Sequence, residues 1–185
     1  MKECAVLKFY GRMDVLGGNG MRRQDREVTD RARIREIIDS CSVCRLGFCD
    51  KDEVYIVPLN FGYEETDGKS VFYFHGAKTG RKADLIRRSA SVMETGMHRV
   101  GFELDRESGL VDGGEQACRY SMRYCSVIGS GYMSELEEPE EKRQALNCIM
   151  AHYTEKTAWE YPDEMLNAVG VFRLEAEKLS CKERK

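Results

Sequence analysis

One stretch of the sequence does most to define the fold, residues 71–82, which read VFYFHGAKTGRK. Residues 71–75 carry the β-branched and aromatic side chains typical of a strand, and a short helix is predicted from Thr79 to Arg88. A helix N-terminus presents unpaired backbone N–H groups and the positive end of the helix dipole, and nearby cations add full charges. Those cations are Lys78, Arg81 and Lys82. The stretch predicts an anion site suited to phosphate, and an ordinary solvated helix start is the competing interpretation.

Other segments on both sides of this stretch are also predicted to be strands. Residues 42–49 and 54–63 flank a charged turn. Pro58 inside the second run indicates an edge strand, a bulge or an interruption of regular pairing. Further strand candidates are residues 100–105, 120–133 and 172–177, and a loop is expected at 109–116. Because about six strands and few helices show no regular alternation, they predict an antiparallel barrel rather than a Rossmann fold.

Two longer helices are also predicted. The first begins after Thr29 and Asp30, and its apolar residues recur at the spacing of one helical face. Those apolar residues are Ile34, Ile37, Ile38 and Cys41. The second begins at Pro139, where carboxylates lie near the positive end of the helix dipole, and is expected to run to about Tyr153.

Length and charge limit the possible functions. The 185 residues suffice for one domain with its own core, predicted over residues 21–185, after a flexible extension at 1–20. The 29 basic and 32 acidic side chains give a formal charge of −3, which argues against a general nucleic-acid surface. No apolar run approaches the roughly 18 to 20 residues that span a bilayer, and no export signal is evident. We therefore expect a cytoplasmic protein without membrane contact.

Cysteines and nucleotide motifs narrow the chemistry further. The eight cysteines are expected to remain thiols in a reducing compartment. Cys41 and Cys44 have metal-type or redox-type spacing, but no second Cys-x-x-Cys pair completes a zinc site, so small buried side chains are the favoured interpretation and no metal is expected. The Walker and Gly-x-Gly-x-x-Gly patterns are also missing, which disfavours nucleoside triphosphates and a Rossmann-bound dinucleotide.

Several segments, taken in order and at their approximate spacing, resemble the nitroimidazole-resistance (Nim) type of flavoprotein in the pyridoxamine 5′-phosphate oxidase-like superfamily. They are Met21–Arg23, Val43–Gly47, Val57–Tyr63, Phe74–Ala77 with Gly80–Lys82, Arg123–Tyr124 with Ser126–Gly129, and His152–Thr154. The resemblance covers residues 21–182. It implies a mainly β split barrel of antiparallel, Greek-key type, which dimerises and binds FMN in clefts between the two subunits.

The resemblance also implies site residues. It places Arg81 and Lys82 on the FMN phosphate, and the main chain of residues 57–61 beside the isoalloxazine. The candidate cofactor-binding residues are Val57, Pro58, Leu59, Asn60, Phe61, Phe74, His75, Gly76, Lys78, Gly80, Arg81, Lys82, Tyr124, Ser126 and Trp159. His75 is the candidate catalytic residue, because histidine exchanges protons near neutral pH, although a lone histidine is more often structural. Trp159 is expected either to cover a flavin or substrate face across the dimer or to lie in the core.

The leading functional hypothesis is an FMN-dependent oxidoreductase. Reduced flavin would pass electrons to a small planar acceptor such as a nitroimidazole or other nitroaromatic, with a reduced nicotinamide as a candidate donor. The loops at 93–99 and 109–116 are expected to shape the substrate opening. Two alternatives stay open: a non-catalytic flavin store or redox sensor, and a haem-binding split barrel with a histidine as axial ligand.

Overall fold

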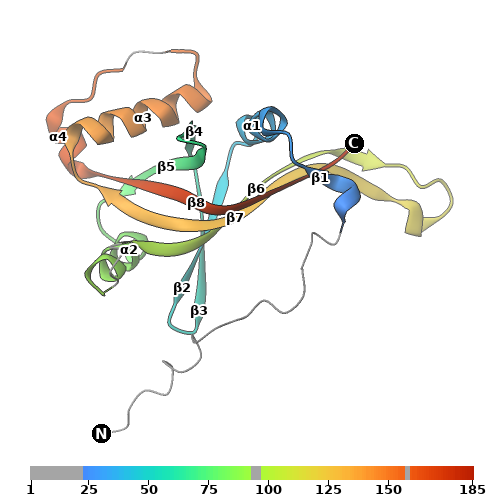
Figure 1. Cartoon of the computed structure of the whole chain (residues 1–185), viewed down its shortest axis with the longest axis horizontal. Coiled ribbons are helices and arrows are strands. Elements are labelled where there is room, and N and C mark those ends of the chain that lie inside the picture. Colours follow the sequence, from blue (N-terminus) through green and yellow to red (C-terminus); the bar gives the residue numbers. More distant parts are fainter. Residues whose placement is uncertain (1–22, 93–96, 157–158) are drawn as a thin grey trace, which may run out of the picture.

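The computed structural model describes residues 23–92, 97–156 and 159–185, so the predicted extension at 1–20 lies outside it. Most of the described chain forms one twisted antiparallel sheet (Figure 1). Its strands are β1 (Glu27–Val28), β2 (Cys44–Asp50), β3 (Glu53–Leu59), β4 (Gly62–Thr66), β5 (Lys69–Ala77), β6 (His98–Val111), β7 (Ser121–Leu136) and β8 (Val169–Arg184). The order across the sheet is β3-β2-β6-β7-β8-β5-β4, and β1 pairs with β8.

The helices of the described chain support this sheet. They are α1 (Arg31–Asp39), α2 (Arg81–Val92), α3 (Pro139–Tyr153) and α4 (Asp163–Ala168), with short 3₁₀ turns at Gln24–Arg26 and Ala117–Arg119. Figure 1 shows α2 and α3 on opposite sides of the strands β5, β7 and β8. None of the helices in the described residues is both long enough and apolar enough to span a bilayer. The mainly β, antiparallel architecture is the one that the sequence predicted.

The buried apolar side chains form two clusters. The larger cluster lies within the curled sheet and joins it to α1 and α2, through residues such as Ile38, Phe72 and Ile86. The smaller cluster packs α3 on the ends of β7 and β8, through Ala145 and Val171 among others. The helix α2 is therefore fixed to β6 and β7, and α3 is fixed to β4, β5 and β8. The candidate site lies where β5 leads into α2.

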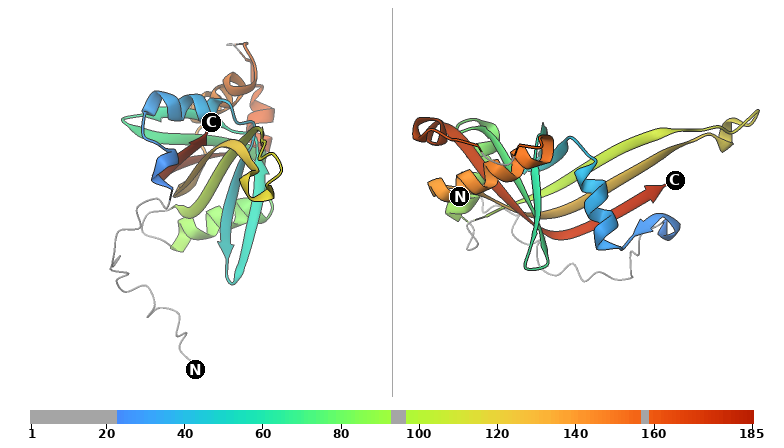
Figure 2. Two further views of the ribbon diagram at one scale, coloured as in Figure 1. Left: turned by 90° about the vertical axis from the view of Figure 1, so that its right-hand side faces the viewer. Right: turned by 90° about the horizontal axis from the view of Figure 1, so that it is seen from above.

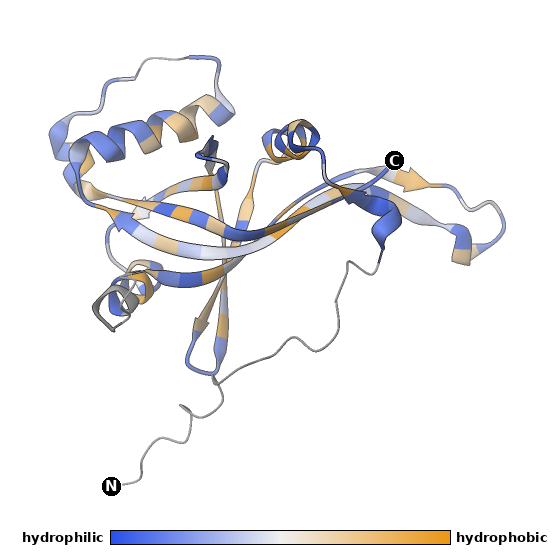
Figure 3. Ribbon diagram, viewed as in Figure 1, coloured by the Kyte–Doolittle hydropathy of each residue, from blue (hydrophilic) through white to orange (hydrophobic). Residues whose placement is uncertain are grey.

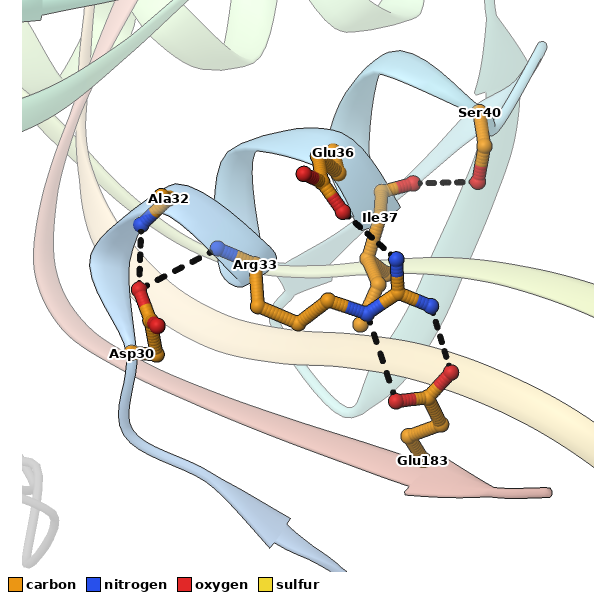
Figure 4. A network of polar contacts seen from close by, with 7 residues as sticks. All are labelled: Asp30, Ala32, Arg33, Glu36, Ile37, Ser40 and Glu183. Atoms are coloured by element: carbon orange, nitrogen blue, oxygen red, sulfur yellow. Dashed lines mark hydrogen bonds and ion pairs between the residues drawn. The ribbon is translucent and has the colours of Figure 1, made fainter.

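The first predicted helix is confirmed as α1. Asp30 caps it, since its carboxylate accepts the backbone N–H groups of Ala32 and Arg33 at 2.8 and 3.4 Å (Figure 4). Ile37 and Ile38 are buried, as the helical periodicity predicted. The helix predicted from Pro139 is also confirmed, whereas α4 was not predicted.

The strand predicted over residues 54–63 is divided in two. It breaks between Leu59 and Gly62, because Gly62 lies against the backbone of α3, where a Cβ would stand 2.5 Å from the Ile149 nitrogen. Among the described strands, β3 is at the edge of the sheet and pairs only with β2. Of the alternatives that Pro58 indicated, the edge position is the one that the structure shows.

The hairpin of β6 and β7 is longer than predicted. A loop was expected at 109–116, but β6 continues to Val111. Gly109 has a φ of 113° and pairs with Arg123, after a register shift that leaves Ser108 unpaired. The paired ends of the two strands project from the body of the sheet (Figure 2). Residues 93–96, part of the other loop expected near the opening, lie outside the described residues.

Candidate functional site

The start of α2 contains a buried cation. Lys82 is only 9% exposed, and its Nζ lies 4.5 Å from the centroid of the Phe172 ring. A Cβ on Gly76 would approach this Nζ to 2.8 Å, so the glycine leaves the space in which the ammonium lies. Within residues 23–92, 97–156 and 159–185 the ammonium forms no hydrogen bond or ion pair. Burial lowers the pKa of Lys82 to about 8.

The neighbouring Arg81, unlike Lys82, is paired with two carboxylates. Its Nε donates to Asp50 at 3.1 Å, and Nη1 and Nη2 donate to Glu53 at 3.1 and 2.7 Å. The guanidinium also lies over the Tyr55 ring, 4.7 Å from its centroid. These carboxylates raise the pKa of Arg81 above its ordinary value. Of the two cations predicted to hold phosphate, Arg81 is engaged by two carboxylates, whereas Lys82 is buried and has no hydrogen-bond or ion-pair partner within the described residues.

Lys78 and Gly80 lie in the loop that joins β5 to α2. The Lys78 side chain is exposed at the surface, and its Nζ donates to the Asn167 carbonyl oxygen of α4 at 3.1 Å. Gly80 has a φ of 111°, and a Cβ on it would meet no atom within 4 Å, so its need for glycine is conformational rather than steric. The loop therefore approaches α2 through a backbone turn that other residues rarely adopt.

His75 and the end of β3 line a shallow hollow of about 190 Å³. Its lining residues are Val43, Pro58, Leu59, Asn60 and His75. Desolvation and the charge of Lys82 lower the pKa of His75, so its imidazole is neutral at pH 7. The structure thus brings His75 together with the predicted isoalloxazine segment, although the two are distant in sequence.

Three other predicted residues, on these strands or in the break between β3 and β4, pack in the core. Phe61 and Phe74 are fully buried, and Val57 packs against the same cluster. The Phe61 N–H donates to the hydroxyl of Tyr153 at 3.0 Å, and that hydroxyl donates to the Ser42 carbonyl at 2.9 Å. Tyr153 was not among the predicted site residues, and the only sequence signal for it was its place in the His152–Thr154 segment.

Three predicted pocket residues lie away from this hollow. The hydroxyl of Tyr124 accepts a hydrogen bond from Arg26 at 3.1 Å. Ser126 lies two residues further along β7, opposite Asp105. The Trp159 indole donates to the Lys156 carbonyl at 3.1 Å, beside the Lys156 ammonium. Their roles in cofactor binding stay predictions.

The cysteines of the described chain are free thiols. Cys41 and Cys44 are buried, as the interpretation as core side chains predicted, and burial raises the pKa of Cys41 to about 11. In the part of the chain that the structure describes, no three His, Cys, Asp or Glu side chains are arranged to hold a metal ion.

Fold and site together define a protein of the split-barrel class, with a buried lysine that has no ion-pair partner among the described residues where β5 leads into α2. The chain belongs to the pyridoxamine 5′-phosphate oxidase family, whose model matches residues 30–183. It is similar to the crystal structure of a proposed 5-nitroimidazole antibiotic resistance protein from Bacteroides thetaiotaomicron, with 32% identity, a TM-score of 0.69, and coverage of 84% of this chain and 85% of that one. The resemblance drawn from the sequence is confirmed.

Two more distant structures share the fold. A flavocytochrome from Azotobacter vinelandii has a TM-score of 0.70 at 17% identity, covering 90% of this chain and 72% of that one. An FAD- and haem-binding protein from Mycobacterium smegmatis has a TM-score of 0.71 at 15% identity, covering 86% and 74%. A search of curated protein sequences found no match.

Proposed function

We propose that the chain is a homodimeric FMN-binding flavoprotein that passes electrons to a small planar acceptor. The observation that carries the proposal is the Lys82 ammonium, which is buried beside Gly76 and unpaired within the described residues. A buried charge without a partner is unfavourable, so such a position indicates a site for a charged ligand. At the start of a helix that ligand is an anion.

The phosphate of FMN fits this position. Lys82 supplies one charge-assisted hydrogen bond, and the backbone N–H groups at the start of α2 supply further donors. Arg81 adds positive potential, although Asp50 and Glu53 already occupy three of its donor positions. We therefore assign the main share of phosphate binding to Lys82 and a smaller share to Arg81.

The proposed dimer uses the outer face of the sheet. Val54 and Ile56 are exposed on β3, and Ile128 is exposed on β7. The strand register aligns Ile56 with Gly47 and Gly101, which present no side chains. The ion pairs of Arg45 with Glu103 and Asp105 lie on the same face. A face that combines exposed apolar residues with charged groups is suited to contact with a second protein surface. Figure 3 shows apolar segments along the β2–β3 hairpin and at the far end of β6.

Several of the predicted site residues lie on this same face. Tyr124 and Ser126 alternate along β7 with buried residues and so share the face of Ile128. Pro58 aligns with Arg45, Glu103 and Ile128 across the strands, which places it on the same face. A second copy on this face brings Tyr124 and Ser126 of one chain toward the cofactor hollow of the other.

In the proposed reaction FMN carries the electrons, and the protein determines access and charge. His75 borders the hollow as a neutral imidazole, from which a ring N–H can donate a hydrogen bond to an acceptor. Leu59 and Pro58 give the hollow an apolar side suited to a planar ring. The similarity to the Bacteroides protein supports a nitroimidazole as the acceptor, and a reduced nicotinamide is the proposed donor.

The visible spectrum and mass of the purified protein test this function. We expect a yellow dimer with flavin absorption that takes up FMN in each subunit, and turnover of a nitroimidazole with a reduced nicotinamide. FMN binding without turnover would indicate a flavin store or sensor, and a Soret band would indicate haem. A colourless monomer that does not take up added FMN would contradict the proposal.

A further inference from the structure

The backbone between β5 and α2 is held by a side chain from α2 itself. Arg87 reaches back toward the helix start, where its Nη2 donates to the Lys78 carbonyl oxygen at 2.7 Å. The Lys78 side chain is also fixed, through its hydrogen bond to the Asn167 carbonyl oxygen. Two contacts from outside the loop therefore hold one of its residues in place.

Fixing the Lys78 carbonyl also fixes the next N–H group. The peptide between Lys78 and Thr79 is trans, so its C=O and N–H point in opposite directions. With the carbonyl turned toward Arg87, the Thr79 N–H points away from Arg87, and the guanidinium neutralises the partial negative charge of the oxygen. A peptide free to turn over would present that oxygen to an approaching anion instead.

Arg87 is in turn held by the sheet. Its Nε and Nη2 donate to the two carboxylate oxygens of Glu135, both at 2.7 Å. Glu135 lies on β7 opposite Phe172, and its side chain is 13% exposed, against 40% for Arg87. Two parallel charge-assisted hydrogen bonds fix the plane of a guanidinium group. A continuous series of contacts thus runs from the sheet through Glu135 and Arg87 to the loop.

We propose that Arg87 and Glu135 are positioning residues for the cofactor phosphate. They hold the Lys78–Thr79 peptide in the orientation that accepts an anion beside Lys82, and neither needs to touch that anion. This role rests on the proposed function, because the anion is the phosphate of FMN. A purely structural ion pair would stabilise the fold without distinguishing FMN from riboflavin, which lacks the phosphate.

The chain contains a matched control for this ion pair. Arg33 of α1 donates from Nε and Nη2 to Glu183 of β8 at 3.3 and 2.5 Å (Figure 4). The exposed fractions of these side chains, 40% and 17%, are close to those of the Arg87–Glu135 pair. Both pairs join a helix to the sheet, but Arg33 has Glu36 as its other partner rather than a loop carbonyl.

The test is a titration of the full chain with FMN and with riboflavin, together with the melting temperature of each variant. We expect Arg87→Met to weaken FMN binding about tenfold, which corresponds to about 1.4 kcal/mol, and to change riboflavin binding less than about twofold. Glu135→Gln should weaken FMN binding by a smaller factor, because one hydrogen bond to Arg87 is kept. Arg33→Met should lower the melting temperature and leave the ratio of the two affinities as in wild type.

The outcomes separate the two proposals. If wild type bound FMN and riboflavin equally, the phosphate site itself would be wrong, and the positioning role with it. If wild type preferred FMN and Arg87→Met kept the full preference, only the positioning role would be overturned. A loss of preference in Arg33→Met equal to that in Arg87→Met would also overturn it, because the effect would then be general destabilisation.

Discussion

The starts of α1 and α2 are built in opposite ways. At α1 the Asp30 carboxylate accepts two backbone N–H groups, and the Arg33 guanidinium lies between Glu36 and Glu183 (Figure 4). At α2 the corresponding position before the helix is Gly80, and Lys82 is buried within the described residues without a counter-charge. At the start of α1 the charged groups meet partners within the chain, whereas at the start of α2 the proposed anion would be the counter-charge of Lys82.

The two helix starts should therefore contribute differently to folding stability and to the proposed binding of an anion. Each contact at the start of α1 stabilises the folded chain, because opposite charges and donors meet their partners. The buried ammonium of Lys82 destabilises it, since burial opposes the charged form. An anion at this position would remove that penalty, and the resulting free energy would appear as affinity.

The largest expected effect is at Lys82. Lys82→Met keeps much of the side-chain volume and removes the charge, so the cofactor-free protein should become more stable, by up to about 3 kcal/mol. FMN binding should weaken by roughly ten- to a hundredfold, with little change for riboflavin. Thermal melts of the cofactor-free protein and parallel titrations would measure both. A destabilised variant with unchanged FMN affinity would remove the contrast between the two helix starts.

The pH dependence of stability should show the same penalty. The pKa of Lys82 is about 8 in the folded chain against 10.5 for an ordinary lysine, so between these values the unfolded chain binds more protons. The free energy of unfolding contributed by this residue should therefore rise as the pH increases from about 8 to about 10.5. Denaturant melts of wild type and Lys82→Met across this range would test it. The difference between the two proteins should shrink with increasing pH, and a constant difference would contradict the assignment.

The smallest expected effect is at Asp30. Asp30→Ala removes the cap of α1 and should lower the free energy of unfolding by about 1 kcal/mol, as is usual for such caps. FMN affinity should not change, because α1 has no part in the proposed site. Chemical denaturation and FMN titration of this variant would complete the comparison. Weaker FMN binding in Asp30→Ala would show that the helix starts are coupled.

Local features of the sequence predicted the elements well. Asp30, the isoleucines of α1 and Pro139 act through neighbours a few residues away, so their effects could be read directly. Pro58 correctly indicated an edge strand for the same reason. The prediction of a loop at Gly109 is wrong. A glycine at a β-bulge between paired strands cannot be told from a glycine in a turn by sequence alone.

The sequence could not distinguish the environments of the two adjacent cations in the candidate site. Lys82 and Arg81 are adjacent in sequence and received the same assignment. The structure separates them because Asp50 and Glu53, about thirty positions earlier, pair with only one of the two. The isolation of Lys82 depends on Gly76 and on Phe172 from a distant strand. Such long-range contacts leave no local pattern in the sequence.

The position of β8 has a consequence for how the chain reaches its native state during synthesis. β8 comes later in the sequence than β1, β5 and β7, the three strands with which it pairs. A nascent chain that has not yet released residues 169–184 from the ribosome therefore exposes the unpaired edges of β5 and β7. These edges are the sites at which two incomplete copies would aggregate or a chaperone would bind. Only completion of β8 hides both.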